Sequence, residues 1–460
     1  MNVILSFDVE DFVTPQADDA LLTWAGILSD LALTGGFALV GERLRSLWRR
    51  GRTDVIDAIA GHEIGYHSNY HSLHPTYPVA ADGLAWDAAV RWVVERDRSG
   101  IEDIRETFGR GSFFYVVPGN SWTPHVSAAM GRLGVRVLGD LPLAPPFKRC
   151  CALGMLSLRY AMSFEQYYGA SSAGQMREAM LRDIGKLSEE CDGEGYIVLY
   201  SHPMMAVTEE YWDTPLAGGG AAPREELKPA KLRPRGRAEE IFRFVRSFLE
   251  ELSSRGDIQM TSYGRLLEEF DASRVKEVRF EEVLDMAAAI LGKFDYVGAG
   301  GRSFAPSEVF GLLVAAAQIR RTSGRFPKDL PVRSLIHPVD MSERELADRR
   351  RCVKAPLAAC LESAAALAEE IDDGRTIPKS IVVGGAEMTA AQYLMALACA
   401  LLEESGREAR PPESVGALPD AAEGAFSEFK YNGTWLFAPE FRGENVLREV
   451  RASSWTYKVL

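Results

Sequence analysis

Two histidines and a cluster of acids have the residue types and spacing to do chemistry in this 460-residue chain. His67 and His71 stand four residues apart in the segment GHEIGYHSNYH. This spacing predicts two imidazoles on one face of a helix, a common way to hold a divalent metal, although exposed or capping pairs also show it. Such an ion needs a further ligand, and Asp8, Glu10 and Asp11 offer carboxylates after a short apolar run.

A metal site of this kind is suited to hydrolysis. Bound Zn²⁺ lowers the pKa of its water toward ~7 and polarises an acyl carbonyl. A nearby carboxylate can take the proton of that water, and an imidazole can give a proton to the departing nitrogen. Asp8 and His202 have the residue types for these two tasks. Zinc is the expected ion, and Co²⁺, Ni²⁺ or Mn²⁺ could take its place.

Apolar runs that end in polar residues predict the strands that carry these groups. The expected strands lie at residues 3–7, 36–40, 111–117, 135–138, 196–200 and 258–261. Helical stretches separate most of them, and this alternation predicts a parallel α/β sheet or barrel. Active sites of such folds form at the carboxyl ends of the strands, where Asp8, Pro118, Asp140 and His202 stand.

The sequence pattern divides the chain into two parts, residues 1–271 and 272–460. Within the first, the polar Gly/Pro-rich segment 214–237 is predicted to be an ordered loop or lid. The second part is predicted to be mainly helical, because alanine and leucine recur there at helical spacing. It also repeats a Gly-Arg-Pro-Lys-type turn and a Gly-Gly pair, which predicts two copies of one unit. Aromatic residues near its end alternate as in a strand, at Phe429, Tyr431, Trp435 and Phe437.

The opening strand and the histidine segment together resemble the polysaccharide deacetylases, the NodB-homology family known as carbohydrate esterase family four. That family begins with acids after its first strand and continues with a nearly identical Gly-His-Glu-Ile-Gly-x-His-Ser/Thr-x-x-His segment. SFDVED and GHEIGYHSNYH carry the resemblance here. Weaker matches follow in the same order at residues 36–42, 199–203 and 261–270, so the resemblance covers residues 1–271.

The resemblance implies an irregular (β/α)7 barrel that removes N- or O-acetyl groups from sugars. It assigns His67 and His71 as metal ligands. It makes Asp8 the general base and His202 the acid that protonates the leaving amine.

Two positions depart from the family pattern. The family's metal-binding acid usually follows the base directly, but Val9 stands there, so Glu10 or Asp11 is the ligand. The family's third motif carries an arginine that buttresses the base, and Val116 takes its place. Either another basic group substitutes for that arginine, or the activity is weak or altered. Asp140 matches loosely the family's acid that orients the catalytic histidine.

Three residues are candidates for contact with a substrate. Pro118 and Trp122 lie in the segment that matches the third motif, and Trp212 lies further along the chain. An aromatic face suits the C–H surface of a sugar ring, but core packing is an equal interpretation for both tryptophans.

The repeats of residues 272–460 faintly resemble pseudomurein-binding repeats. The other interpretation is a helical domain that packs on the barrel or joins two copies of the chain into a homo-oligomer.

Composition excludes several classes of function. The net charge of −13 and a pI near 5.2 disfavour binding to nucleic acid or to an anionic membrane surface. The longest apolar stretch is shorter than a membrane span, and the first residues lack the pattern of a secretory leader, so a cytoplasmic location is expected. The six cysteines form no CxxC pair and are expected to be reduced.

The sequence therefore predicts a metal-dependent carbohydrate deacetylase that hydrolyses N-acetyl groups with metal-bound water as the nucleophile. Its first alternative is a hydrolase of another non-peptide C–N bond, such as a cyclic amide, on the same barrel. Its second alternative is a catalytically silent glycan-binding protein, which the missing arginine and the repeat region favour.

Overall fold

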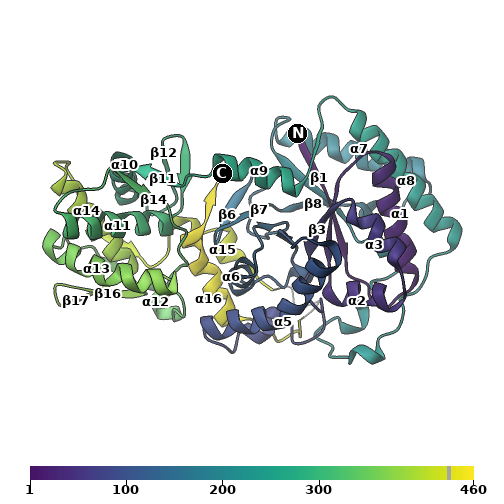
Figure 1. Cartoon of the computed structure of the whole chain (residues 1–460), viewed down its shortest axis with the longest axis horizontal. Coiled ribbons are helices and arrows are strands. Elements are labelled where there is room, and N and C mark those ends of the chain that lie inside the picture. The colour runs from purple at the N-terminus through teal and green to yellow at the C-terminus, as the bar shows by residue number, and fades with distance from the viewer. Residues whose placement is uncertain (432–436) are drawn as a thin grey trace. The chain divides into compact units, whose positions relative to one another are not determined.

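The structure, a computed structural model, describes residues 1–431 and 437–460 (Figure 1). Trp435 lies outside the described residues, so the expected aromatic alternation stays a prediction. The chain divides into two compact units. The first comprises Met1–Arg149, Met155–Ala272 and Tyr431–Gly443, and the second comprises Cys150–Gly154, Ser273–Lys430 and Glu444–Leu460.

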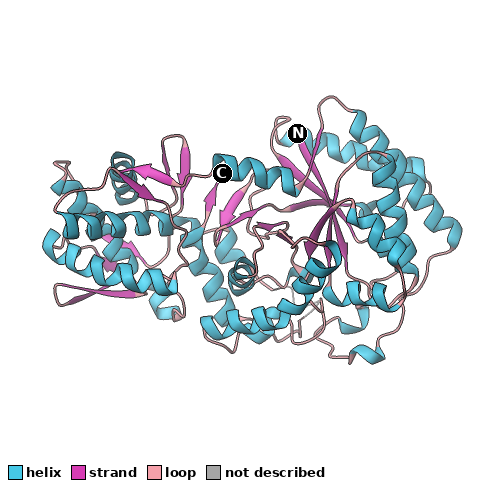
Figure 2. Cartoon of the chain, in the orientation of Figure 1, coloured by secondary structure: helices cyan, strands magenta, loops and turns pink. Residues whose placement is uncertain are grey.

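A sheet of parallel strands forms the centre of the first unit (Figure 2). Its strands run in the order β7-β5-β4-β3-β2-β1-β9-β8, with β10 also paired to β1. Their bounds are β1 (Asn2–Val9), β2 (Gly35–Leu39), β3 (Glu63–Tyr66), β4 (Phe114–Tyr115), β5 (Val137–Leu138), β7 (Met155–Ser157), β8 (Tyr160–Ser163), β9 (Tyr196–Ser201) and β10 (Gln259–Thr261).

The chain connectivity requires this sheet to curl. β7 and β8 lie at opposite ends of the strand order, yet only two residues separate Ser157 from Tyr160. Such a link spans at most about 11 Å, whereas a flat sheet of this order would be roughly 34 Å wide. The two ends of the sheet therefore lie close together. The curled parallel sheet and the helices between its strands agree with the mixed α/β class expected from the sequence. The count of seven strand–helix units in the expected barrel stays a prediction.

Helices follow most of the strands and surround the sheet (Figure 2). They are α1 (Gln16–Asp30), α2 (Gly41–Arg49), α3 (Thr53–Ala60), α4 (Tyr77–Ala81), α5 (Trp86–Phe108), α6 (Pro124–Arg132), α7 (Ala173–Glu190), α8 (Arg235–Ser254) and α9 (Tyr263–Ser273). Their sequences are amphipathic: α8 buries Ile241, Phe244, Phe248 and Leu252, which recur every three or four residues.

One face of the curled sheet carries an apolar cluster that includes Ile4 of β1, Phe114 of β4 and Val198 of β9. Close packing there explains a glycine in the histidine segment, because a Cβ atom on Gly65 would lie 2.2 Å from the Phe114 ring. Successive side chains of a strand point to opposite faces, so Asp8 lies on the same face of β1 as Ile4. The apolar cluster therefore leads toward polar groups at the carboxyl end of the sheet.

Each of the six expected strands overlaps a strand of the structure, namely β1, β2, β4, β5, β9 and β10. Sequence analysis missed β3, β7 and β8, which are three or four residues long and lack long apolar runs. The expected lid holds two short 3-10 turns, Thr214–Leu216 and Arg224–Glu226, before α8 begins at Arg235.

The second unit combines helices with short antiparallel strand pairs. Its helices are α10 (Phe280–Gly292), α11 (Pro306–Ser323), α12 (Glu343–Ala347), α13 (Leu357–Gly374), α14 (Ala390–Glu404), α15 (Ala425–Glu428) and α16 (Glu444–Ala452). Its strands are β6 (Cys150–Ala152), β11 (Glu277–Arg279), β12 (Val297–Ala299), β13 (Arg302–Phe304), β14 (Asp329–Pro331), β15 (Arg349–Arg351), β16 (Ser380–Val383), β17 (Ala386–Thr389), β18 (Ser414–Gly416) and β19 (Lys458–Val459).

The repeated Gly-Gly pairs form matching turns in this unit. Gly300–Gly301 joins β12 to β13, and Gly384–Gly385 joins β16 to β17. All four glycines have positive φ, which a two-residue hairpin turn requires and glycine adopts at no steric cost. Each hairpin leads into a long helix, α11 or α14, and these helices pack against α13 and α10 respectively.

Across residues 1–431 and 437–460, we find no helix whose length and apolar character would let it cross a membrane.

Candidate metal centre and active site

Parallel register brings the candidate residues to one edge of the sheet. Phe7 of β1 pairs with Ser201 of β9, and Leu39 of β2 pairs with both Val9 of β1 and Tyr66 of β3. Asp8, His67 and His202 therefore leave their strands at nearly the same level.

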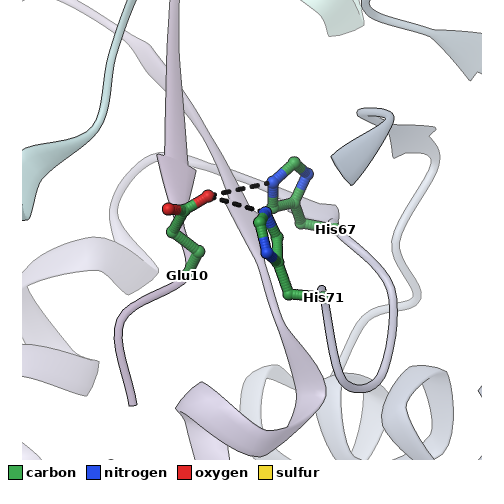
Figure 3. A group of neighbouring side chains, drawn as sticks. All are labelled: Glu10, His67 and His71. Carbon is green, nitrogen blue, oxygen red and sulfur yellow. Dashed lines mark ion pairs between the residues drawn. The ribbon is translucent and has the colours of Figure 1, made fainter. Parts of the chain in front are cut away.

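Glu10, His67 and His71 converge from two of these strand ends (Figure 3). Their candidate ligand atoms all lie within 4.8 Å of one another, and all three residues are buried. Glu10 Oε2 is 2.8 Å from His71 Nε2 and 3.6 Å from His67 Nε2. This is one oxygen and two nitrogens in a closed space, the protein donor set of many catalytic zinc sites.

His67 provides the strongest test of whether these residues fit a metal. Its Nδ1 lies 2.9 Å from the carbonyl oxygen of Val116, and a carbonyl only accepts, so Nδ1 carries the hydrogen. Nε2 then presents a lone pair toward Glu10, and it is buried without a hydrogen-bond partner among the described residues. Facing lone pairs in a buried place are unfavourable unless a cation lies between them. The three residues therefore fit a divalent ion.

The charges around His71 also favour a bound cation. Burial alone would lower the pKa of His71, but the Glu10 carboxylate and Asp213 outweigh it and raise this pKa to about 10. Burial would raise the pKa of Glu10, but the two imidazoles hold it well below its usual value. The site therefore favours positive charge at His71 Nε2, where a proton and a metal ion would compete.

The expected helix beneath the two histidines is wrong. Residues 67–71 form a loop after β3, in which Ser68 and His71 have φ values of 70° and 52°. Two left-handed residues turn the chain back on itself, so His67 and His71 converge without helical periodicity. The loop is anchored where the Asn69 amide donates to Asp97 Oδ1 at 2.9 Å.

The structure brings Glu10, and not Asp11, to the histidines. Side chains alternate along β1 and its extension, so Glu10 lies on the face of Asp8 and Asp11 lies on the other. Asp11 Oδ1 instead accepts hydrogen bonds from the amides of Val13 and Thr14, at 2.9 and 2.8 Å. Asp11 therefore shapes the turn after β1.

Asp8 lies between a phenol and an imidazole. The Tyr160 hydroxyl donates to Asp8 Oδ1 at 2.6 Å, and Asp8 Oδ2 is 3.6 Å from His202 Nε2. The Tyr160 hydroxyl is also 2.9 Å from Ser6 Oγ. The neutral Tyr160 phenol thus contacts the Asp8 carboxylate, which lacks the arginine expected from the family. Val116 stands in the place of that arginine and supplies only its carbonyl to His67.

His202 is held in place by Glu165 and Tyr211. Glu165 Oε1 lies 3.6 Å from His202 Nδ1 and accepts the His202 amide at 2.7 Å, while the Tyr211 hydroxyl is 3.3 Å from Nδ1. Burial would lower the pKa of His202, but the contact with Glu165 and the charges of Glu10, Glu165 and Asp8 raise it to about 9. The imidazole is therefore protonated at neutral pH.

Asp140 does not stand where the resemblance implied. The carboxylate beside His202 Nδ1 is Glu165. Asp140 Oδ1 accepts the amide of Tyr160 at 3.0 Å and so links the end of β5 to the start of β8. Burial and the charge of Asp8 help raise the pKa of Asp140 to about 6.

The predicted substrate-contacting residues have different surroundings. Trp122 is 1% exposed and donates its indole N–H to Ser127 Oγ at 2.9 Å, so it presents no open face to a sugar. Trp212 is also buried, but its N–H donates to Glu10 Oε1 at 3.2 Å. Pro118 is buried in the 3-10 turn Pro118–Asn120 that follows β4.

Sequence reasoning missed four residues of this site: Tyr160, Glu165, Tyr211 and Asp213. Tyr160 is the first residue of the unrecognised strand β8 and Glu165 follows its end, and an acid just beyond a strand end was the available signal for Glu165. Tyr211 and Asp213 adjoin Trp212 in a loop, and no sequence spacing connects them to the histidines.

Neither a protein family model nor a curated protein matches this sequence. Solved structures similar to the chain include a putative polysaccharide deacetylase from Mycobacterium smegmatis, with 20% identity and a TM-score of 0.41 over 59% of this chain and 90% of that one. A family 4 carbohydrate esterase from Streptomyces lividans has 13% identity and a TM-score of 0.31 over 56% and 91%. A 4-alpha-glucanotransferase from Thermococcus litoralis has 11% identity and a TM-score of 0.41 over 59% of this chain and only 40% of that one. The similar structures thus include members of the family that residues 1–271 resemble.

Proposed function

We propose that residues 1–271 form a metal-dependent hydrolase on an irregular (β/α)7 barrel that removes N-acetyl groups from a sugar or glycan. The observation that carries this proposal is the buried His67 Nε2, which faces Glu10 and His71 and has no hydrogen-bond partner among the described residues. The adjacent pair of Asp8 and His202 supports the hydrolytic part of it.

Glu10, His67 and His71 would hold the ion, zinc by preference, which would make a bound water acidic and polarise an acyl carbonyl. Asp8 serves as the general base. The Tyr160 phenol on Oδ1 fixes the carboxylate and leaves Oδ2 to accept a proton.

His202 serves as the general acid. Its raised pKa, about 9, keeps it protonated at neutral pH, so Nε2 has a proton to give to the departing nitrogen. An amine leaves poorly without that proton, which is why a charged imidazole suits the cleavage of an amide. Glu165 and Tyr211 hold Nδ1 and so aim Nε2 toward Asp8.

Metal analysis tests the first half of the proposal. The purified protein is expected to retain about one zinc ion per chain, and His67→Ala combined with His71→Ala is expected to lose it. His62→Ala is the matched control, because His62 is a buried histidine of the same segment whose ring contacts Ser29 and Ala25 away from the site. A wild-type protein without bound metal, or a double variant that retains it, contradicts the proposal.

Acetate release from a panel of N-acetylated sugars tests the second half. Loss of a general base costs typically 10²–10⁴-fold, so Asp8→Asn is expected to lower the rate by at least about 100-fold while zinc content is unchanged. Equal rates in the two proteins refute Asp8 as the base. A zinc-loaded protein that opens cyclic amides but releases no acetate would be a hydrolase of another C–N bond, and one that only binds glycans would be catalytically silent.

A further inference from the structure

Three consecutive residues, Tyr211, Trp212 and Asp213, each contact a different group of the site. Tyr211 reaches His202, Trp212 reaches Glu10, and Asp213 reaches His71. We infer that residues 211–213 are a positioning segment that orients both the metal ligands and the general acid. This inference rests on the proposed function and extends it to residues that contact neither metal nor substrate.

Asp213 makes the most specific of these contacts. Its side chain is 0% exposed, and Oδ2 lies 3.3 Å from His71 Nδ1. Neither of its oxygens has a hydrogen-bond partner in the described part of the chain, and its side chain faces His71 as an ion pair. A buried carboxylate is costly unless it is paired. The negative charge of Asp213 beside Nδ1 favours the hydrogen of His71 on that nitrogen, which also lies 3.1 Å from Ser72 Oγ. The Nε2 lone pair is then directed toward Glu10 and the metal position, as outer carboxylates do for metal-bound imidazoles.

Trp212 orients the acidic ligand. Its indole N–H donates to Glu10 Oε1 at 3.2 Å, which leaves Oε2 directed toward the two histidines. The ring itself packs against Phe12 and His71, with centroids 4.4 and 5.7 Å away. The indole therefore fixes the carboxylate and also restricts the imidazole beside it.

Tyr211 completes the set on the acid side. Its hydroxyl lies 3.3 Å from His202 Nδ1, on the side of the ring opposite the nitrogen that faces Asp8. The two rings meet edge to face with centroids 5.1 Å apart. Tyr211 thus acts on proton transfer, whereas its two neighbours act on the metal.

Residues 211–213 belong to the loop that follows β9, and this loop is fixed at its base by two contacts close to them. Thr208 pairs with Leu232, and the Glu209 amide donates to the Lys231 carbonyl at 2.8 Å. Because the three contacts come from adjacent residues, they form or break as a set. Movement of this segment would loosen the metal ligands and the general acid together.

Zinc affinity of the full chain, measured by competition with a chromophoric chelator, tests the inference. Loss of an outer partner of a metal ligand typically costs 10–100-fold in affinity, so Asp213→Asn is expected to raise the zinc Kd by that factor. Asp213→Glu should recover most of the affinity because it keeps the charge. Asp257→Asn is the control, since Asp257 is exposed and pairs with Arg255 at the amino end of the sheet.

Two further variants separate the roles within the segment. Trp212→Phe keeps an aromatic ring but removes the N–H, so it is expected to raise the Kd at least threefold and to alter the visible spectrum of the cobalt-loaded protein. Tyr211→Phe is expected to leave the zinc Kd within twofold and to change the pKa of His202 instead.

The outcomes distinguish this inference from the proposed function. A wild-type protein that binds no zinc overturns both. A wild-type protein that binds zinc, with Asp213→Asn and Trp212→Phe both within twofold of it, overturns the inference alone. If Asp213→Asn fails to fold, Trp212→Phe and the cobalt spectrum decide the matter.

Discussion

The Glu165 carboxylate is expected to control the charge of His202, the proposed general acid. Glu165→Gln keeps the shape of the side chain and an oxygen that can accept from the Ser201 hydroxyl and the His202 amide, but it removes the negative charge 3.6 Å from His202 Nδ1. At an effective dielectric constant of about 20, two unit charges at this distance attract by about 4–5 kcal/mol. Since 1.36 kcal/mol corresponds to one pKa unit, the pKa of His202 can fall by at most about 3.

The fall is expected to be smaller than this limit but larger than 1. Burial already acts to lower the pKa of His202, and the charges of Asp8 and Glu10 that help to raise it remain in the variant. An imidazole with a pKa of about 9 in the wild type should therefore titrate between about 6 and 8 in Glu165→Gln.

Nuclear magnetic resonance titration of the metal-free protein measures this directly. The chain has seven histidines, and the His202 signal is assigned by its loss in His202→Asn. Ser171→Ala, a change of an exposed hydroxyl just before α7, provides the control. A pKa of His202 in Glu165→Gln within 0.5 of the wild-type value would refute the assigned role of Glu165.

The same shift makes a prediction about stability. The pKa of His202 is raised in the folded protein, so its interaction with Glu165 contributes fully below the unfolded value of about 6.5 and is lost as the pH rises through about 9. The difference in free energy of unfolding between wild type and Glu165→Gln should therefore be largest below pH 6.5 and shrink toward pH 9 and above. A difference that grows with pH would contradict this reasoning.

Three further outcomes are expected. Tyr160→Phe removes a charge-assisted hydrogen bond to Asp8 worth roughly 1.5–3 kcal/mol, so steady-state kinetics should show kcat about 10–100-fold lower with unchanged zinc content. Gly65→Ala places a Cβ atom 2.2 Å from the Phe114 ring, and this overpacking should cost about 1–3 kcal/mol in urea denaturation, whereas Gly83→Ala, with open space around its Cβ, should not. Removal of zinc by a chelator should lower the Tm reversibly, because zinc at 100 times its Kd adds about 2.7 kcal/mol of stability; an unchanged Tm would argue against a bound ion in the fold.

The convergence of Asp8 and His202 could be predicted because it depends on local signals. Each residue follows a short apolar run, and parallel strands bring their carboxyl ends to one edge. Side chains alternate between the two faces of a strand, so Glu10 lies on the same face of β1 and its extension as Asp8, and Asp11 lies on the other. This alternation favours Glu10 over Asp11 as the residue that faces the histidines.

The loop beneath the histidines could not be predicted from spacing alone. A spacing of four positions between two histidines fits a helix as well as a turn. The residue types of Ser68 and His71 do not predict their positive φ values. Tertiary contacts decide between them, among them the hydrogen bond from the Asn69 amide to Asp97 in α5.

The identity of the acid beside His202 depends on how the sheet closes. Glu165 reaches His202 because β8, which precedes it, pairs with β9 at the far end of the strand order. Asp140 also follows a strand end and so fits the same sequence pattern. Its carboxylate instead accepts a hydrogen bond from the Tyr160 amide. Such a choice is set by the pairing of strands distant in sequence, which local propensity does not encode.

The place of β1 in the strand order has a consequence for synthesis of the chain. Asn2 pairs with Tyr196 of β9, so one edge of this strand waits for a partner that lies 194 residues later. At about 5–20 residues per second, translation leaves that edge open for roughly 10–40 seconds. An open edge on an apolar strand invites pairing with other chains. A fold that pairs β1 with so distant a partner therefore benefits from protection of the nascent chain until β9 emerges from the ribosome.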